Sequence, residues 1–158
     1  MNIFRSSGFT LIETMLYLAL FSMLAGGAVA AGYNLIEAAN RNQTRAVLIE
    51  EGNFLLGKIG WSLQQAGTVA SGSPQELSVS RLDSSFIDFS LADDSLVMAA
   101  DGYSAPLNNA GTKVSEFSVE LEPIASIELI HISLVLSAIT VDGKTVNQRF
   151  DTVKTLFQ

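Results

Sequence analysis

The sequence contains no cysteine, which excludes disulfide bonds, thiolate metal sites and a cysteine nucleophile. Only one histidine is present, and neither a glycine-rich phosphate loop nor a metal-binding histidine pair accompanies it. Proline occurs at only three of the 158 positions, so few helices or strands are interrupted by it. Because the residue patterns of most enzymes are missing, we expect a protein without catalytic residues and without a cofactor.

Basic residues are also scarce. Nine Lys and Arg stand against sixteen Asp and Glu, which gives a formal net charge of −7. Proteins that bind the phosphate backbone need clustered cations, because binding depends on the release of counterions. We therefore expect no nucleic-acid partner.

The longest apolar run lies near the N-terminus. Residues 9–36 contain a single carboxylic acid, Glu13. At about 1.5 Å per residue this run would form roughly 42 Å of helix, which exceeds the ~30 Å hydrocarbon core of a bilayer. The run therefore predicts a membrane-spanning helix.

Two simple interpretations of this run leave Glu13 unexplained. One is a plain membrane anchor. The other is a secretory signal peptide with Arg5 in its n-region, residues 16–25 as its h-region and cleavage after Ala30 in the segment Ala28-Val29-Ala30. In the second interpretation the mature chain would be an exported periplasmic binding protein or enzyme. A carboxylic acid within an apolar span is costly, and it marks a functional site by default.

The segment Gly8-Phe9-Thr10-Leu11-Ile12-Glu13, which follows a short leader with a basic residue, resembles the N-terminal signal of type IV pilin-like proteins. The resemblance implies that prepilin peptidase cleaves between Gly8 and Phe9, and that the new amine of Phe9 is methylated. It further implies that the apolar helix is retained as a filament core, where Glu13 pairs with the N-terminal amine of a neighbouring subunit.

The same resemblance implies a location and a set of partners. The chain would be a single-pass protein of the inner membrane with its C-terminal domain outside the cytoplasm, and would then enter a periplasmic or extracellular filament. The absence of the C-terminal cysteine pair found in many major pilins favours a minor pilin or pseudopilin that starts or tips a filament. The expected partners are other minor subunits, the major subunit, prepilin peptidase and the inner-membrane assembly platform, with no small-molecule substrate.

Helical periodicity continues beyond the apolar run. Leu48, Gly52, Leu55, Ile59 and Leu63 recur at three- and four-residue steps, and they predict a helix face covered by a β domain. The helix should end near residues 66–67, where Gly67 and a Ser-Gly-Ser-Pro segment follow. We expect a leader over residues 1–8, a transmembrane helix over 9–36, its amphipathic continuation over 37–66 and an extracytoplasmic β domain over 67–158.

A second apolar stripe runs along the same helix. Val47, Phe54 and Trp61 are spaced by seven residues, and Glu51 and Lys58 separate them from the first face. The stripe is either the margin of a wide core face or a contact for the helix of another subunit, since aromatic residues anchor interfaces.

The second half of the chain has strand-like patterns. Short runs at residues 76–81, 85–91 and 95–99 precede longer ones at 114–121 and 127–138, and Val114 lies out of phase with its run. Asp142-Gly143, between residues 139–141 and 144–146, predicts a hairpin. These patterns indicate an α+β fold in which one face of an antiparallel sheet is covered by the long N-terminal helix. The order of elements also resembles the J-type minor pseudopilins of type II secretion and the corresponding minor pilins of type IV pili.

Two groups of polar residues are candidate sites. His131 lies on a predicted strand with Glu128 and Ser133 nearby in sequence, and we expect a structural histidine because no nucleophile motif accompanies it. Some pseudopilins bind calcium in loops, and four aspartates form a loose acidic group. No EF-hand spacing occurs, and hairpin turns favour aspartate, so we expect turn residues and no metal site. The four aspartates are Asp88, Asp93, Asp94 and Asp101.

Overall fold

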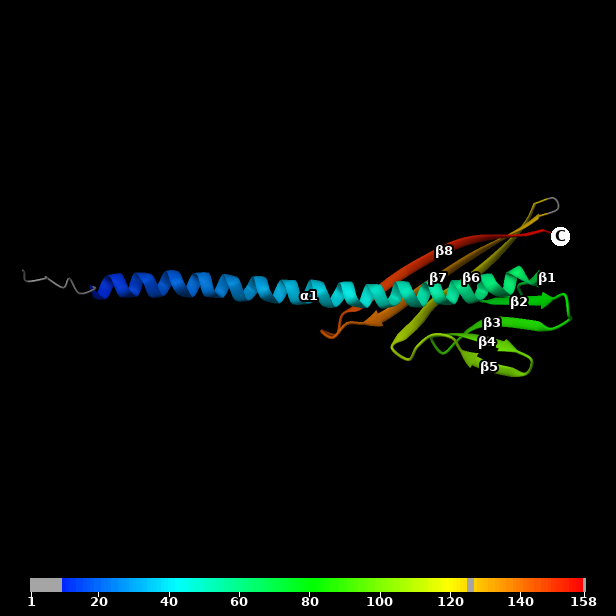
Figure 1. Ribbon diagram of the computed structural model, residues 1–158, viewed down its shortest axis with the longest axis horizontal. Helices are drawn as coiled ribbons and strands as arrows, with labels where there is room; N and C mark the ends of the chain where they lie inside the picture. The colour runs from blue at the N-terminus through cyan, green and yellow to red at the C-terminus, as the bar shows by residue number, and fades with distance from the viewer. Residues whose placement is uncertain (1–9, 125–126, 158) are drawn as a thin grey trace, which may run out of the picture. The chain divides into compact units, whose positions relative to one another are not determined.

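The computed structural model describes residues 10–124 and 127–157 (Figure 1). One long helix is followed only by strands, which confirms the α+β expectation. The helix is α1 (Leu11–Gln64). The strands are β1 (Ala66–Ala70), β2 (Glu76–Arg81), β3 (Phe86–Ala92), β4 (Ser95–Ala100), β5 (Tyr103–Pro106), β6 (Thr112–Ile124), β7 (Ile127–Ile139) and β8 (Thr145–Phe157).

The chain divides into two compact units, residues 1–39 and residues 40–158. In the described part of the first unit, every large apolar side chain from position 11 to position 36 is exposed. The predicted cleavage residues, Gly8 and Phe9, lie outside the described residues. The second unit combines the rest of α1 with all eight strands.

Within the second unit, α1 buries the face that its periodicity predicts. Leu48, Leu55 and Ile59 are fully buried, with Gly52 and Leu63 on the same face. The helix ends at Gln64, where the Ser62 hydroxyl donates a hydrogen bond to the Ile59 carbonyl at 2.7 Å. The helix therefore ends two residues before the expected end at 66–67, and both of those residues lie in β1.

The first five strands form an antiparallel sheet in the order β1-β2-β3-β4-β5. Its inner face buries Leu77, Val79, Ile87, Phe89 and Leu96. Each strand follows its neighbour through a short turn, so this sheet is a meander in which every pairing is local in sequence.

The other three strands form a second antiparallel sheet in the order β6-β7-β8. Alternate residues of β7 are buried, which confirms the period-2 set Ile130, Ile132, Leu134 and Leu136. The register of β6 against β7 shifts between Val114 and Glu116, so Ser115 forms a bulge. The bulge explains why Val114, although out of phase with Phe117, is buried beside it.

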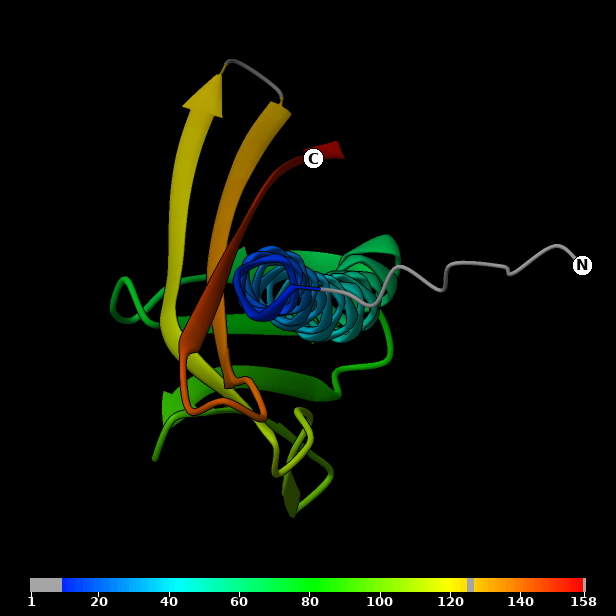
Figure 2. The ribbon, with the colours of Figure 1, turned by 90° about the vertical axis from the view of Figure 1, so that its left-hand side faces the viewer.

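The two sheets cross at a steep angle, and the turns of α1 that belong to the second unit lie against both (Figure 2). Phe150 of β8 contacts the helix at Gly52, where the aromatic ring occupies the space that a Cβ atom would need. The absence of a side chain at this position therefore allows β8 and the helix to approach closely.

Several strand predictions need correction. Strands β1 and β5 were not predicted, because four or five small or polar residues carry no clear alternation. Only the first residues of β8 were predicted, because its inner face includes Gln148, Thr152 and Lys154, which hide the period of two. The hairpin at Asp142-Gly143 exists, but residues 140–144 form its connection, so Thr140, Val141 and Lys144 are not in strands.

Candidate functional site

The apolar run of α1 offers a surface that nothing in the described chain covers. It is long and apolar enough to cross a membrane, and none of its most apolar window is buried. A helix that is apolar on all sides needs an apolar environment, either lipid or other helices. The run is therefore a candidate for both membrane insertion and helix–helix assembly.

Glu13 lies in the first turn of α1. Its backbone N–H donates to the Thr10 hydroxyl at 3.4 Å, as in the first half of a capping box, and the Tyr17 hydroxyl donates to its carboxylate at 3.5 Å. Both contacts join Glu13 to residues three or four positions away, and both distances are long for hydrogen bonds. The carboxylate therefore keeps acceptor positions for a group outside the chain.

The second stripe of α1 is exposed to a similar degree along its length. Val47, Phe54 and Trp61 are between 44% and 48% exposed. The Arg81 guanidinium of β2 lies 4.8 Å from the centre of the Trp61 ring, and the Lys58 ammonium lies 5.7 Å from that of Phe54. The three side chains are therefore half-covered by their own unit and leave one side free for a partner.

Glu51, on the margin of this stripe, has a role that the sequence did not reveal. Glu51 as a whole is 7% exposed, and its carboxylate accepts two hydrogen bonds from Asn109, one from the backbone N–H at 2.7 Å and one from Nδ2 at 2.6 Å. We call this arrangement the Glu51–Asn109 clasp. It ties the loop between β5 and β6 to the helix, beside a groove of about 390 Å³ that is also lined by Val47, Phe54 and Leu107. The only available sequence signal was an acid at the edge of an apolar face.

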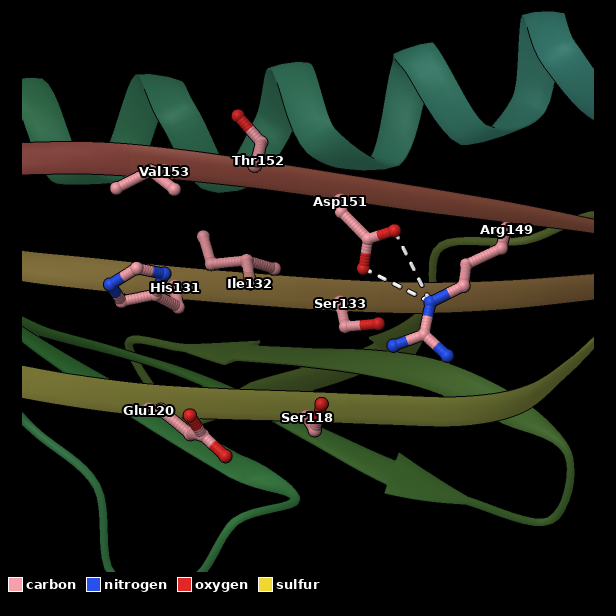
Figure 3. Close-up of a pocket in the computed structure, with 9 residues that line it drawn as sticks. All are labelled: Ser118, Glu120, His131, Ile132, Ser133, Arg149, Asp151, Thr152 and Val153. Carbon is pink, nitrogen blue, oxygen red and sulfur yellow. Dashed lines mark hydrogen bonds and ion pairs between the residues drawn. The ribbon is translucent and has the colours of Figure 1, made fainter.

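A second depression, of about 320 Å³, lies on the outer face of the β6-β7-β8 sheet (Figure 3). Ser118, Ser133 and Asp151 form one row across its three strands, and Glu120, His131 and Val153 form the next. The Arg149 Nε donates to both carboxylate oxygens of Asp151, at 3.1 and 3.2 Å. The nearby Ser133 hydroxyl and then the Arg149 guanidinium lower the pKa of Asp151 from its ordinary value, and of the two only Arg149 is placed to form a hydrogen bond with the carboxylate.

This depression holds a serine, a histidine and an aspartate, but their connections differ from those of a catalytic triad. In a triad the acid orients the histidine, and the histidine accepts the proton of the serine. Here Asp151 lies beside Ser133, while the Nε2 atom of His131 faces Glu122 at 3.4 Å. His131 and Ser133 follow each other on one face of β7, roughly 7 Å apart along the strand. The side chains therefore form a polar sheet surface.

The four aspartates occupy turns and strands. Asp93 and Asp94 both have positive φ angles, and so do Asp101 and Gly102, which is the geometry of two-residue hairpin turns. Asp94 also accepts a hydrogen bond from Lys113 at 2.8 Å, and Asp88 accepts one from Ser78. Within residues 10–124 and 127–157, no group of three acidic or histidine side chains is placed to hold a metal ion.

Residues 3–29 match the family model of the prokaryotic N-terminal methylation motif. The matched segment contains the Gly8–Phe9 junction, Glu13 and most of the exposed apolar run. The match therefore supports a type IV pilin-like role for this part of the chain. No curated protein and no solved structure has significant similarity to the chain.

Proposed function

We propose that this chain is a minor pilin or pseudopilin, a structural subunit that starts or tips a type IV pilus-like or type II secretion filament. The observation that carries the proposal is the methylation motif over residues 3–29, at the head of an apolar helix that the described chain leaves uncovered. Before assembly, lipid would surround this helix in the inner membrane. After assembly, the corresponding helices of other subunits would replace the lipid.

The N-terminal chemistry follows from cleavage between Gly8 and Phe9 by prepilin peptidase. Cleavage creates a cationic amine, which remains cationic after a single methylation. In an apolar filament core such a cation needs a counterion, and the Glu13 carboxylate of a neighbouring subunit would supply it. The pair would form at one axial displacement of the two helices, so it would define the register of an incoming subunit.

The half-exposed stripe Val47, Phe54 and Trp61 supports a second contact. It lies on the part of α1 that is packed on the sheets, so it is held in a defined geometry before any partner binds. Aromatic residues and arginine dominate the binding energy of many interfaces, and Trp61 with Arg81 provides such a pair. We propose that this stripe contacts the helix of another minor subunit.

Within the family, we propose a J-type position. The support is the order of the elements, which begins with a long helix, continues with the hairpin of β3 and β4 and then reaches the long strands β6 and β7, which β8 follows. The chain exposes a large surface area, and its depressions are open and shallow. A site for a small molecule encloses most of that molecule's surface, so these depressions favour a structural subunit over an enzyme that acts on a small molecule.

Intact mass tests the proposal. Co-expression with a prepilin peptidase should remove residues 1–8, add one methyl group and change the formal net charge from −7 to −8, because Arg5 is lost. Gly8→Val should block processing, because a β-branched side chain crowds the backbone at the cleavage site. Ser7→Val adds similar bulk one residue earlier and serves as the control, which should be processed. A product that begins at Ala31 would instead identify an ordinary signal peptide.

A further inference from the structure

The connection between β7 and β8 ends in an apolar apex. Val141 is 93% exposed, and the neighbouring Ile139 is 67% exposed. Both side chains line a shallow depression of about 310 Å³ together with Asn40 and Thr44 of α1. The apex therefore lies beside the first residues of the helix that belong to the second unit.

This apex is a hydrogen-bonded turn. The Thr140 backbone N–H and hydroxyl both donate to the Lys144 carbonyl at 2.8 Å, and the Thr140 hydroxyl accepts from the Lys144 N–H at 3.0 Å. Thr140 is buried, and Gly143 supplies the positive φ angle that the turn requires. Turn positions usually carry polar residues, and here Val141 and the neighbouring Ile139 together make the apex apolar, so their place beside the membrane-spanning run decides which partner they fit.

The chain itself limits how far this surface can lie from a membrane. Asn40 follows Ile36, the last residue of the apolar run, by only four residues. Even fully extended, four residues reach no more than about 14 Å, whatever the arrangement of the two units. The neighbouring segments 37–45 and 139–144 carry three basic residues against two acids, a local net charge of +1, while the whole chain has a net charge of −7. Lys144 lies 3.4 Å from Asp142, so the basic excess is a single charge, and an anionic bilayer surface repels these segments less than the rest of the chain.

We propose that Val141 and Ile139 insert into the headgroup region of the bilayer that holds the N-terminal helix. This lipid contact would fix the orientation of the second unit on the membrane before assembly, and the unit would leave the lipid when the subunit joins a filament. The inference depends on the membrane insertion that belongs to the proposed function, but on neither cleavage nor methylation. It adds a second, reversible membrane contact outside the spanning helix.

The absence of cysteine allows a direct test in the full-length chain. Single cysteines at Val141, Leu82 and Leu20, one per variant, would each carry an environment-sensitive fluorophore. Each labelled chain would be placed in lipid nanodiscs, at one chain per disc, with nitroxide quenchers both near the headgroup and along the acyl chains of a fraction of the lipids, so that the interface and the apolar centre are both sampled. Leu82 is the matched control for Val141, because it is an apolar residue 87% exposed in another turn of the same unit. It lies beside Gly67, which follows the far end of α1, roughly 36 Å along the helix from Asn40.

We expect the nitroxide lipids to reduce the fluorescence at positions 20 and 141 about twofold and to leave the fluorescence at position 82 nearly unchanged. Apolar groups at a membrane interface reach about 5–10 Å into it, so a label at position 141 would come within range of the nitroxides. Equal quenching at positions 141 and 82, with strong quenching at position 20, would overturn the lipid contact and leave the proposed function intact. A label at position 141 that is unquenched in single-chain discs, and becomes shielded from a water-soluble quencher in discs that hold several chains, would assign the apex to a second subunit and also overturn the lipid contact. Weak quenching at all three positions would show that the N-terminal helix does not span the membrane, and it would contradict both proposals.

Discussion

Glu51 is the only charged side chain that is buried among the residues that the structure describes. A buried carboxylate is tolerated when its oxygens are paired, and here both oxygens accept hydrogen bonds from Asn109. The clasp joins residues that are 58 positions apart in the chain, so it holds a loop on the helix that local structure alone would not position.

Glu51→Ala should therefore destabilise the second unit. It removes two hydrogen bonds and leaves the Asn109 N–H without its acceptor, at an expected cost of about 1–3 kcal/mol in the free energy of unfolding. Urea unfolding of the chain in detergent, followed by the fluorescence of Trp61, the single tryptophan, measures this change. Glu50→Ala is the matched control, because Glu50 is exposed, and it should change stability by less than about 0.5 kcal/mol. Equal effects of the two substitutions would contradict the clasp.

At the scale of elements, the contact between α1 and β8 depends on Gly52. Gly52→Ala should destabilise the chain by about 1–3 kcal/mol, because the added methyl group overlaps the ring of Phe150. Gly57 lies on the same helix with no neighbour near its Cβ position, so Gly57→Ala should be neutral or stabilising by up to about 1 kcal/mol. The two thermal midpoints, measured side by side, test the assignment. If Gly52→Ala leaves the thermal midpoint unchanged, β8 does not pack closely on the helix.

The exposed stripe on α1 makes a different prediction. Trp61→Ala should lower the unfolding free energy only modestly, by ~1 kcal/mol for the lost Arg81 contact, since almost half of the side chain is exposed. Co-purification with other minor subunits should fall far more. Tyr103→Ala removes an exposed aromatic side chain from β5 and is the control, which should retain binding. If the Trp61 variant co-purifies as well as the unchanged chain, the stripe is not part of the interface.

How far the sequence predicts these elements depends on how regular their patterns are. The covered face of α1 follows from a period of 3.6 that holds from Leu48 to Leu63, and β7 follows from an unbroken period of two. The bulge at Ser115 shifts the period of two within β6, so Val114 lies out of phase with the rest of that strand in the sequence. The Glu51–Asn109 clasp could not be predicted, because its two members meet only in the folded unit. The roles of Gly8, Phe9 and Glu13 remain predictions.

At the scale of the whole molecule, Glu13 links a single chain to an assembly. Glu13→Val should insert in the membrane and be processed normally, yet enter filaments at about one tenth of the normal level or less, which corresponds to a loss of ~1.4 kcal/mol or more. The quantity to measure is the ratio of filament-bound to membrane-bound subunit. Thr14→Val replaces the next residue on the helix, which lacks a carboxylate, and should assemble normally.

One position in a filament would be exempt from this prediction. A subunit at the extreme tip has no neighbour above it, so its own carboxylate has no amine to pair with. Normal incorporation of Glu13→Val at several positions along a filament would show that Glu13 is not an assembly contact. Normal incorporation at the tip alone would locate this subunit there.

The contact between Gly52 and Phe150 also has a consequence for the order of events during synthesis. The apolar face of α1 leaves the ribosome early, but β8, which covers part of it, is the last strand to be made. Chains are synthesised from the N-terminus, so residues 48–63 stay partly uncovered until translation is almost finished. A chain that stops before residue 145 would keep every residue of the methylation motif and the apolar run, yet expose Gly52 and its neighbours permanently. Such a chain would reach the membrane and then aggregate there.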